Sequence, residues 1–145
     1  MEVYTIGFTQ KSAAQFFDTL KRAGIKRLLD VRLNNVSQLA GFSKRDDLAY
    51  FLREICGADY VHEPLLAPTQ ELLDAYKKQK GDWTDYEPRF LALMAERRIE
   101  TTFDRRLLDG PTVLLCSEAT AEHCHRRLVL EYLQRFDPAI EPVHL

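Results

Sequence analysis

Short and long apolar patterns alternate along the chain and predict alternating strands and helices. Short apolar runs at 3–6, 25–32, 112–115 and 140–145, and a weaker one at 59–62, are typical of strands. The segments between them carry apolar residues at helical spacing. A helix is expected after Ser12, which forms a capping-box motif with Gln15, and others near 48–55, 69–80 and 86–108, the last as either one helix or two.

This alternation predicts one α/β domain over residues 1–145, with three layers (α/β/α) and a five-stranded, mainly parallel sheet. The first 32 residues have the spacing of a βαβ unit, which requires parallel strands and a right-handed crossover. We expect the strand order 3-2-1-4-5. In that order Gly7 lies beside residues 116–118, and Arg32 is one strand away.

The segment 112–132 concentrates polar chemistry at the end of a strand. A buried strand is followed by Cys116-Ser117-Glu118 and then by a helix, for which Thr120 is the expected N-cap. Counted from Ala121, the helical phase places His125 on the stripe that faces the sheet. Because ligands of parallel α/β domains bind at the carboxyl ends of strands, we expect the functional site at this edge.

Composition and charge narrow the class of protein only slightly. The formal net charge is -2, which gives no global attraction for nucleic acids or acidic membranes. The first residues lack the features of a signal peptide, no stretch is apolar enough to span a membrane, and a reducing cytoplasm is the expected location. The three cysteines do not suggest a disulfide framework.

Two charged clusters are candidates for the site, each with a structural alternative. Arg32 can bind a phosphate or carboxylate, or it can form an internal ion pair with Asp30, two residues before it. Glu118 follows a buried strand, where burial would raise its pKa and suit it to general acid or base chemistry. Alternatively, Glu118 stabilises the N-terminus of the next helix.

The cysteines and the histidine of the junction allow three interpretations. Cys124 and His125 could act as a nucleophile and its base, and Cys116, Cys124 and His125 could bind zinc. No CxxC or HxxxH spacing supports a metal site, so no metal ligand is assigned and no cofactor is identified. Burial statistics favour the third interpretation, in which both thiols fill the core. Cα atoms more than about 7 Å apart would exclude a disulfide without backbone movement.

Basic residues with aromatic neighbours suggest a further surface. They are Lys77, Lys78, Lys80, Arg97, Arg98, Arg105 and Arg106, with Trp83 and Tyr86. Such a set could bind nucleic acid by charge and stacking, but interleaved acidic residues favour a solvated helix face.

Several of these segments together resemble the family known as domain of unknown function 488. The resemblance rests on Tyr4-Thr5-Ile6-Gly7, Leu29-Asp30-Val31-Arg32 with Ser37 and Phe42, Tyr60-Val61-His62, Leu115-Cys116-Ser117-Glu118 with Cys124-His125-Arg126, and Val143-His144-Leu145. It implies a bacterial and archaeal cytoplasmic α/β protein without a settled biochemical role. The implied shared polar positions are Gly7, Asp30, Arg32, Ser37, Glu118, Cys124, His125 and Arg126.

The chain departs from the family pattern at three places. Phe8 stands where the family usually has a histidine, Asn35 replaces a proline, and Leu65-Leu66-Ala67 replaces a Leu-Gly-Gly turn. The lost histidine argues against a mechanism that needs a base on the first loop. The lost glycines indicate a different loop over the site.

The leading functional hypothesis is an enzyme-like pocket that binds an anionic ligand, a nucleotide or nucleic-acid fragment. Arg32 and Arg126 would bind the ligand, with Gly7, Asp30 and Ser37 around it. Catalysis, a hydrolysis or group transfer, would use Glu118 as general acid or base, with Cys124 and His125 beside it. The alternatives are a non-catalytic module that binds nucleic acid or protein, and a thiol or metal protein.

Overall fold

The structure is a computed structural model that describes residues 1–35, 41–77, 79, 81–118 and 121–145. Its five strands are Glu2–Gly7 (β1), Arg27–Asp30 (β2), Asp59–His62 (β3), Thr112–Cys116 (β4) and Glu141–His144 (β5). They form one sheet in which every neighbouring pair is parallel. The order is β3-β2-β4-β1-β5. The predicted α/β class is therefore confirmed.

The predicted strand order, 3-2-1-4-5, is wrong because β4 lies between β1 and β2. All five residues of β4 are buried, whereas Glu2 of β1 is exposed and Tyr4 is only partly buried. The strand that is apolar throughout takes the centre of a sheet covered on both faces. Because β4 pairs with both β1 and β2, the segments that follow Gly7, Asp30 and Cys116 lie at one edge of the sheet.

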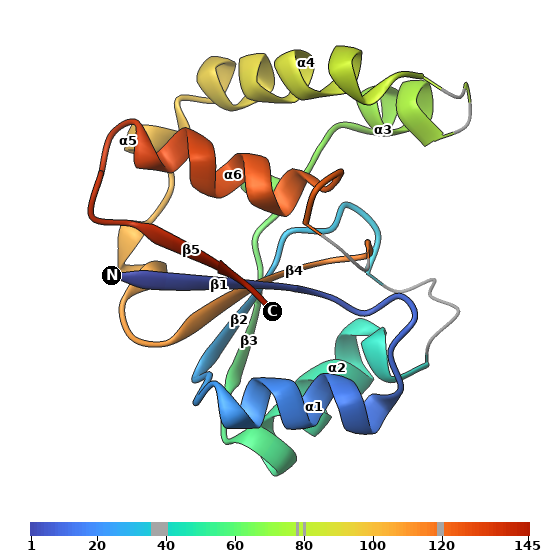
Figure 1. Cartoon of the computed structure of the whole chain (residues 1–145), viewed down its shortest axis with the longest axis vertical. Helices are drawn as coiled ribbons and strands as arrows, with labels where there is room; N and C mark the ends of the chain where they lie inside the picture. Colours follow the sequence, from blue (N-terminus) through green and yellow to red (C-terminus); the bar gives the residue numbers. More distant parts are fainter. Residues whose placement is uncertain (36–40, 78, 80, 119–120) are drawn as a thin grey trace.

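Helices cover both faces of the sheet (Figure 1). One face carries Ala13–Arg22 (α1) and Arg45–Phe51 (α2), which continues as a π-helical turn, Leu52–Cys56. The other face carries His125–Gln134 (α6), with Gln70–Lys77 (α3) and Trp83–Glu96 (α4) beyond it. Short helical segments complete the chain: Gly41–Ser43, Pro64–Leu66, Ile99–Thr102 (α5) and Arg105–Leu108. Among the described residues, every helix is too short or too polar to cross a membrane.

The start of α1 follows its sequence signal. The Ser12 hydroxyl accepts a hydrogen bond from the Gln15 backbone (3.1 Å), and the Ser12 backbone donates to the Gln15 side chain (2.8 Å). This capping box satisfies two amides that lack partners within the helix. Phe16, Phe17 and Leu20 point from α1 into the core, as the spacing predicts.

Two helices differ from their predicted bounds. The region 86–108 is not continuous, because Arg98 adopts a left-handed conformation (φ 53°) between α4 and α5. α6 begins at His125 with Cys124 as its N-cap, so the predicted start near Ala121 is wrong. Thr120, the expected cap, lies outside the described residues. Leu128, Val129 and Tyr132 are nonetheless buried, as expected.

Candidate functional site

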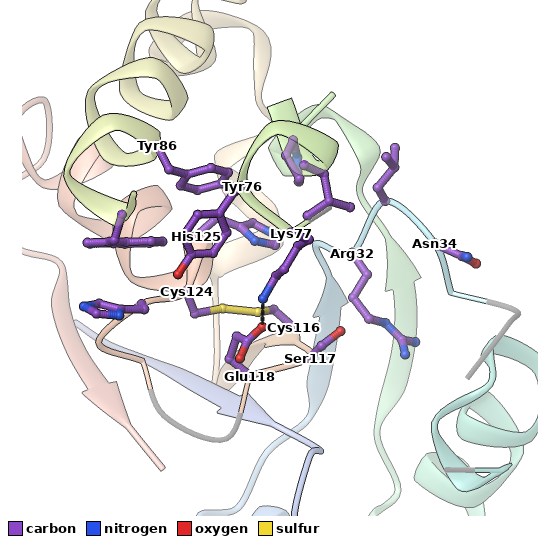
Figure 2. Close-up of a pocket in the computed structure, with 15 residues that line it drawn as sticks. Arg32, Asn34, Tyr76, Lys77, Tyr86, Cys116, Ser117, Glu118, Cys124 and His125 are labelled. Atoms are coloured by element: carbon purple, nitrogen blue, oxygen red, sulfur yellow. Dashed lines mark hydrogen bonds and ion pairs between the residues drawn. A yellow bond between two sulfur atoms is a disulfide. The ribbon is translucent and has the colours of Figure 1, made fainter. Parts of the chain in front are cut away.

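A pocket of about 210 Å³ opens where the segments after β2 and β4 meet the helices beyond α6 (Figure 2). Segments after two strands and two helices line it. From the sheet come residues 32–34 after β2, and residues 116–118 and 123–125 of the β4–α6 junction. From the helical side come Pro68, which precedes α3, then Leu73, Tyr76 and Lys77 of α3, and Trp83 and Tyr86 of α4. The pocket therefore lies at the carboxyl edge of the sheet, where parallel α/β domains bind ligands. This is the edge that the sequence predicts.

Aromatic rings form one wall of the pocket. The Trp83 ring stacks on His123 (centroids 5.1 Å apart) and on Tyr86 (5.2 Å), and Tyr76 contacts both Trp83 and Tyr86. Trp83 and Tyr86 are buried, at 9% and 4% exposure. They line a pocket and do not present stacking rings on an open surface, so these two rings do not form the nucleic-acid surface that was the less favoured interpretation of the basic helices.

Lys77 and Glu118 form an ion pair at this pocket. The pair joins the last turn of α3 to the junction after β4 (Figure 2). Their side chains are 47% and 39% exposed, so Glu118 is not the buried carboxyl that the sequence predicts. Glu118 follows the end of β4 by two residues, so its side chain can turn toward solvent, where it pairs with Lys77 of α3.

The two cysteines of the junction are bonded to each other in this structure. The Cys116–Cys124 disulfide lines the pocket, both residues are 2% exposed, and their Cα atoms are 7.4 Å apart. Both residues are buried in the core, as the third interpretation expects, but their sulfurs are bonded to each other. Their Cα separation exceeds the limit of about 7 Å beyond which no disulfide was expected without backbone movement. Cys56 is the remaining, free cysteine.

His125 is held in one tautomer. Its Nε2 lies 2.7 Å from the carbonyl oxygen of Val31, and because a carbonyl only accepts, Nε2 carries the hydrogen. Burial lowers the pKa of His125 to about 4, against a smaller opposite effect of the Val31 hydrogen bond. The ring is thus neutral at neutral pH, and Nδ1 keeps its lone pair.

Arg32 forms the internal ion pair with Asp30 that was one of the two expectations. Nε and Nη2 of Arg32 each donate to a different oxygen of Asp30 at 2.8 Å, and Nη2 also donates to the carbonyl of Ser43 at 2.8 Å. Both side chains are buried, and Phe8 packs against the guanidinium at 5.4 Å. Arg32 also lines the pocket, and its buried Nη1 has no hydrogen-bond partner among the described residues.

Asp30 is further held by β3. The Tyr60 hydroxyl donates to Asp30 at 2.5 Å and accepts from the Asn35 amide at 3.0 Å. Burial, followed by the hydrogen bond to Asp30, raises the pKa of Tyr60. Asp30 thus acts as the centre of a hydrogen-bonded network that fixes Arg32.

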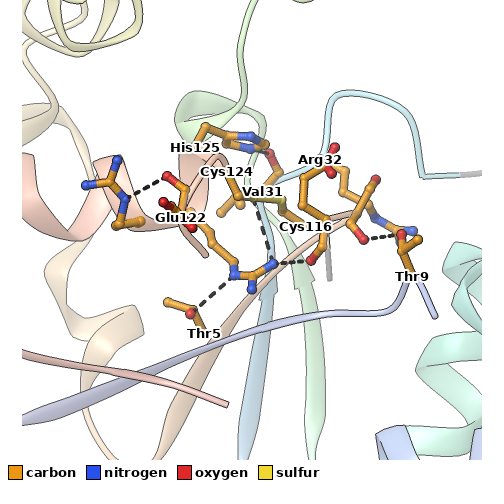
Figure 3. The surroundings of a disulfide bond; sticks show 12 residues. Thr5, Thr9, Val31, Arg32, Cys116, Glu122, Cys124 and His125 are labelled. Carbon is orange, nitrogen blue, oxygen red and sulfur yellow. Dashed lines mark hydrogen bonds between the residues drawn. A yellow bond between two sulfur atoms is a disulfide. The ribbon is translucent and has the colours of Figure 1, made fainter. Parts of the chain in front are cut away.

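Arg126 does not line the pocket, and its Nη1 lies 3.9 Å from the sulfur of Cys124, one end of the disulfide shown in Figure 3. Its side chain is fully buried; Nη1 donates to the carbonyl of Glu118 at 2.6 Å and Nε to the Thr5 hydroxyl at 3.3 Å. Burial lowers the pKa of Arg126 to about 10, although Glu118 opposes the shift. Nη2 has no partner among the described residues. Its observed contacts make Arg126 a positioning residue for the Glu118 backbone.

Gly7 allows this arrangement. A Cβ atom at this position would overlap the carbonyl oxygen of Glu118 and lie 2.6 Å from Nη1 of Arg126. The end of β1 and the junction after β4 can approach so closely only without a side chain.

Two described arginines of the basic set, Arg97 and Arg105, do not line the pocket. Arg97 donates to the carbonyls of Leu65 and Ala67 at 2.7 and 2.6 Å, and thereby fixes the loop after β3. Arg105 pairs with Asp137. Ser37, a predicted ligand-binding residue, lies outside the described residues, as do Lys78 and Lys80.

Fold and site together define an α/β domain with a pocket at the carboxyl edge of a parallel sheet. The family model described as domain of unknown function DUF488 matches residues 12–133, and the chain belongs to this family. The resemblance noted from the sequence is therefore confirmed. A comparison with curated proteins and with solved structures finds no match.

Proposed function

We propose that the pocket binds a small anionic ligand with a planar ring, a nucleotide or a terminal fragment of a nucleic acid. One observation supports this most directly: the pocket lining combines the partly exposed ring of Tyr76, which packs on the buried Trp83 and Tyr86, with the cationic side chains Arg32 and Lys77. Aromatic rings stack on bases of any identity, and arginine and lysine bind phosphate. A volume of about 210 Å³ suits one base-sized group.

Each cationic group has a separate role in this proposal. Arg32 is oriented by Asp30, and its Nη1 is buried without a partner among the described residues; the proposal requires the ligand to reach this nitrogen and accept a hydrogen bond from it. Lys77 is half exposed, and its ion pair with a described residue is to the surface carboxylate of Glu118, so a phosphate can compete for it. The ligand would thus lie between a fixed and an adjustable cation.

Glu118 gives the pocket its catalytic candidate. A phosphate that draws Lys77 away from Glu118 would leave this carboxylate beside the ligand without its counter-charge. The freed carboxylate would then accept a proton from an attacking water or hydroxyl, as hydrolysis or group transfer requires. In this proposal Cys124 and His125 line the site next to the reacting group. A cytoplasmic location is part of the proposal.

The first test is calorimetric titration with nucleoside monophosphates, the corresponding nucleosides and inorganic phosphate. We expect the monophosphates to bind more tightly than either part alone. Lys77→Met should weaken monophosphate binding about tenfold, roughly 1.4 kcal/mol. Lys21→Met, in the last turn of α1 on the opposite face of the sheet, is the matched control and should bind as the unmodified protein does. Equal binding by both variants would refute the phosphate role of Lys77.

The second test separates an enzyme from a non-catalytic module. With a substrate found by that screen, Glu118→Gln should abolish turnover and leave binding intact. A fully active variant would rule out the acid or base role. A protein that binds an oligonucleotide tightly and in a strongly salt-dependent way, but no mononucleotide, would instead be a nucleic-acid module.

A further inference from the structure

Three side chains of types that commonly bind metals lie close together in the lining of the pocket. Each of Cys116, Cys124 and His125 offers a ligand atom, and these atoms all lie within 4.8 Å of one another. We propose that the reduced protein binds one divalent ion of the zinc class through both cysteine sulfurs and Nδ1 of His125. The fourth coordination position would face the pocket. This inference does not require the nucleotide proposal.

The ligand types and their number fit this class of ion. Two thiolates and one imidazole match the donor atoms of zinc sites, and three protein ligands with one open position are typical of catalytic zinc. All three residues line the pocket, so the open position would be accessible to a bound molecule. On binding, the two thiols lose their protons to solvent, and each sulfur forms one bond to the ion.

The backbone spacing leaves room for an ion between the sulfurs. The Cα atoms of Cys116 and Cys124 are 7.4 Å apart, beyond the common range of about 4.4–6.8 Å for disulfides. Two sulfurs bound tetrahedrally at about 2.3 Å from zinc lie about 3.8 Å from each other. The cysteines could therefore separate to that distance by rotating their side chains once the bond between them is reduced.

His125 is already oriented as a ligand. Its Nε2–H is bonded to the Val31 carbonyl at 2.7 Å, and Phe90 packs against its ring at 5.4 Å. A backbone carbonyl on the far nitrogen is the usual partner of a metal-bound histidine, because it fixes both the tautomer and the ring plane. Nδ1 is then the nitrogen that keeps a lone pair for a metal.

Arg126 provides a charge that suits bound thiolates. Nη1 of Arg126 lies 3.9 Å from the Cys124 sulfur, and the guanidinium forms no ion pair with a described carboxylate. A buried cation of this kind is stabilised by a negatively charged sulfur. In a reducing compartment, which the sequence predicts, the cysteines would be thiols and thus able to bind an ion.

The test uses the full chain, reduced with a phosphine and freed of metal by a chelator. Co²⁺ or Zn²⁺ is then added without any nucleotide. We expect one ion per chain, and with Co²⁺ both sulfur-to-cobalt charge-transfer absorption and the strong visible bands of a tetrahedral site. Cys124→Ser and His125→Ala should each weaken binding by about a hundredfold or more. Cys56→Ser is the matched control and should bind as the unmodified protein does.

A second measurement needs no variant in the site. Zn²⁺ should protect Cys116 and Cys124 of the reduced native protein from alkylation while Cys56 continues to react, as peptide mass spectrometry would show. Circular dichroism of each variant confirms that it is folded. Substoichiometric binding, cobalt spectra without sulfur bands, or loss of the ion in Cys56→Ser alone would overturn the proposal. Since none of these readouts involves a nucleotide, failure here leaves the proposed function to its own test.

Discussion

Replacing Gly7 by alanine tests the geometry on which the whole site depends. The added methyl group would overlap the carbonyl oxygen of Glu118 and approach Nη1 of Arg126 to 2.6 Å. Neither neighbour can move freely: one is a backbone atom and the other is the end of a fully buried side chain. The segment after β4 must therefore shift away from β1.

The expected cost follows from two effects. Overpacking of a buried position costs about 1–3 kcal/mol. Loss of the hydrogen bond from Arg126 to the Glu118 carbonyl, now 2.6 Å, adds about 1.5–3 kcal/mol because the donor is charged and buried. We expect Gly7→Ala to lower the free energy of unfolding by about 3–5 kcal/mol, which is a large part of the stability of an ordinary domain.

Urea unfolding followed by circular dichroism measures this change. Gly41→Ala is the matched control, since a Cβ there meets no atom of the described residues within 4 Å and no left-handed conformation is required. It should be neutral or stabilise by up to about 1 kcal/mol. If the Gly7 and Gly41 variants unfold at the same urea concentration, the close approach of β1 to the junction after β4 is not as described.

Three further predictions concern the ion pair of Asp30, the side chain of His125 and the start of α1. Asp30→Asn leaves the Arg32 guanidinium buried without a counter-charge and should destabilise the fold by about 3–5 kcal/mol in urea unfolding. His125 has a pKa of about 4 in the fold, below its ordinary value of 6.5, so the unfolded chain takes up its proton first and stability should fall as pH drops from about 6.5 to 4. The loss for the disulfide form should reach up to about 3 kcal/mol, and His125→Gln should remove that part of the pH dependence. Ser12→Ala, which breaks the capping box, should lower the melting temperature slightly, for a cost of about 1 kcal/mol.

Local signals predicted the local structure well. The capping box at Ser12 and the buried strand at 112–116 appear where the sequence places them, because each depends on residues within one or two turns. The strand order was wrong because it depends on which strands neighbour each other after long crossovers. The unbroken apolar run Val113-Leu114-Leu115-Cys116, against Glu2 and Thr5 in β1, was the sequence signal that could have placed β4 in the centre.

The composition of the pocket was less predictable than its location. The carboxyl edge follows from a parallel sheet, but the aromatic wall comes from α3 and α4, which pack beyond α6 and not on the sheet. No short-range pattern tells that Trp83 stacks on His123, forty residues later. The disulfide could not be predicted either, since its cysteines are eight positions apart, which is no recognised motif spacing.

The two buried arginines differ in how well the desolvation cost of the guanidinium is compensated. Arg32 is compensated by both oxygens of Asp30, whereas the partners of Arg126 among the described residues are a backbone carbonyl, a hydroxyl and a distant sulfur. A guanidinium buried without a carboxylate costs several kcal/mol, so any ligand that brings negative charge near Arg126 gains that energy on binding. Bound thiolates would do so directly. Metal should therefore stabilise the reduced protein by more than its three ligands alone would provide, and Arg126→Met should reduce this gain while the ligand set stays intact.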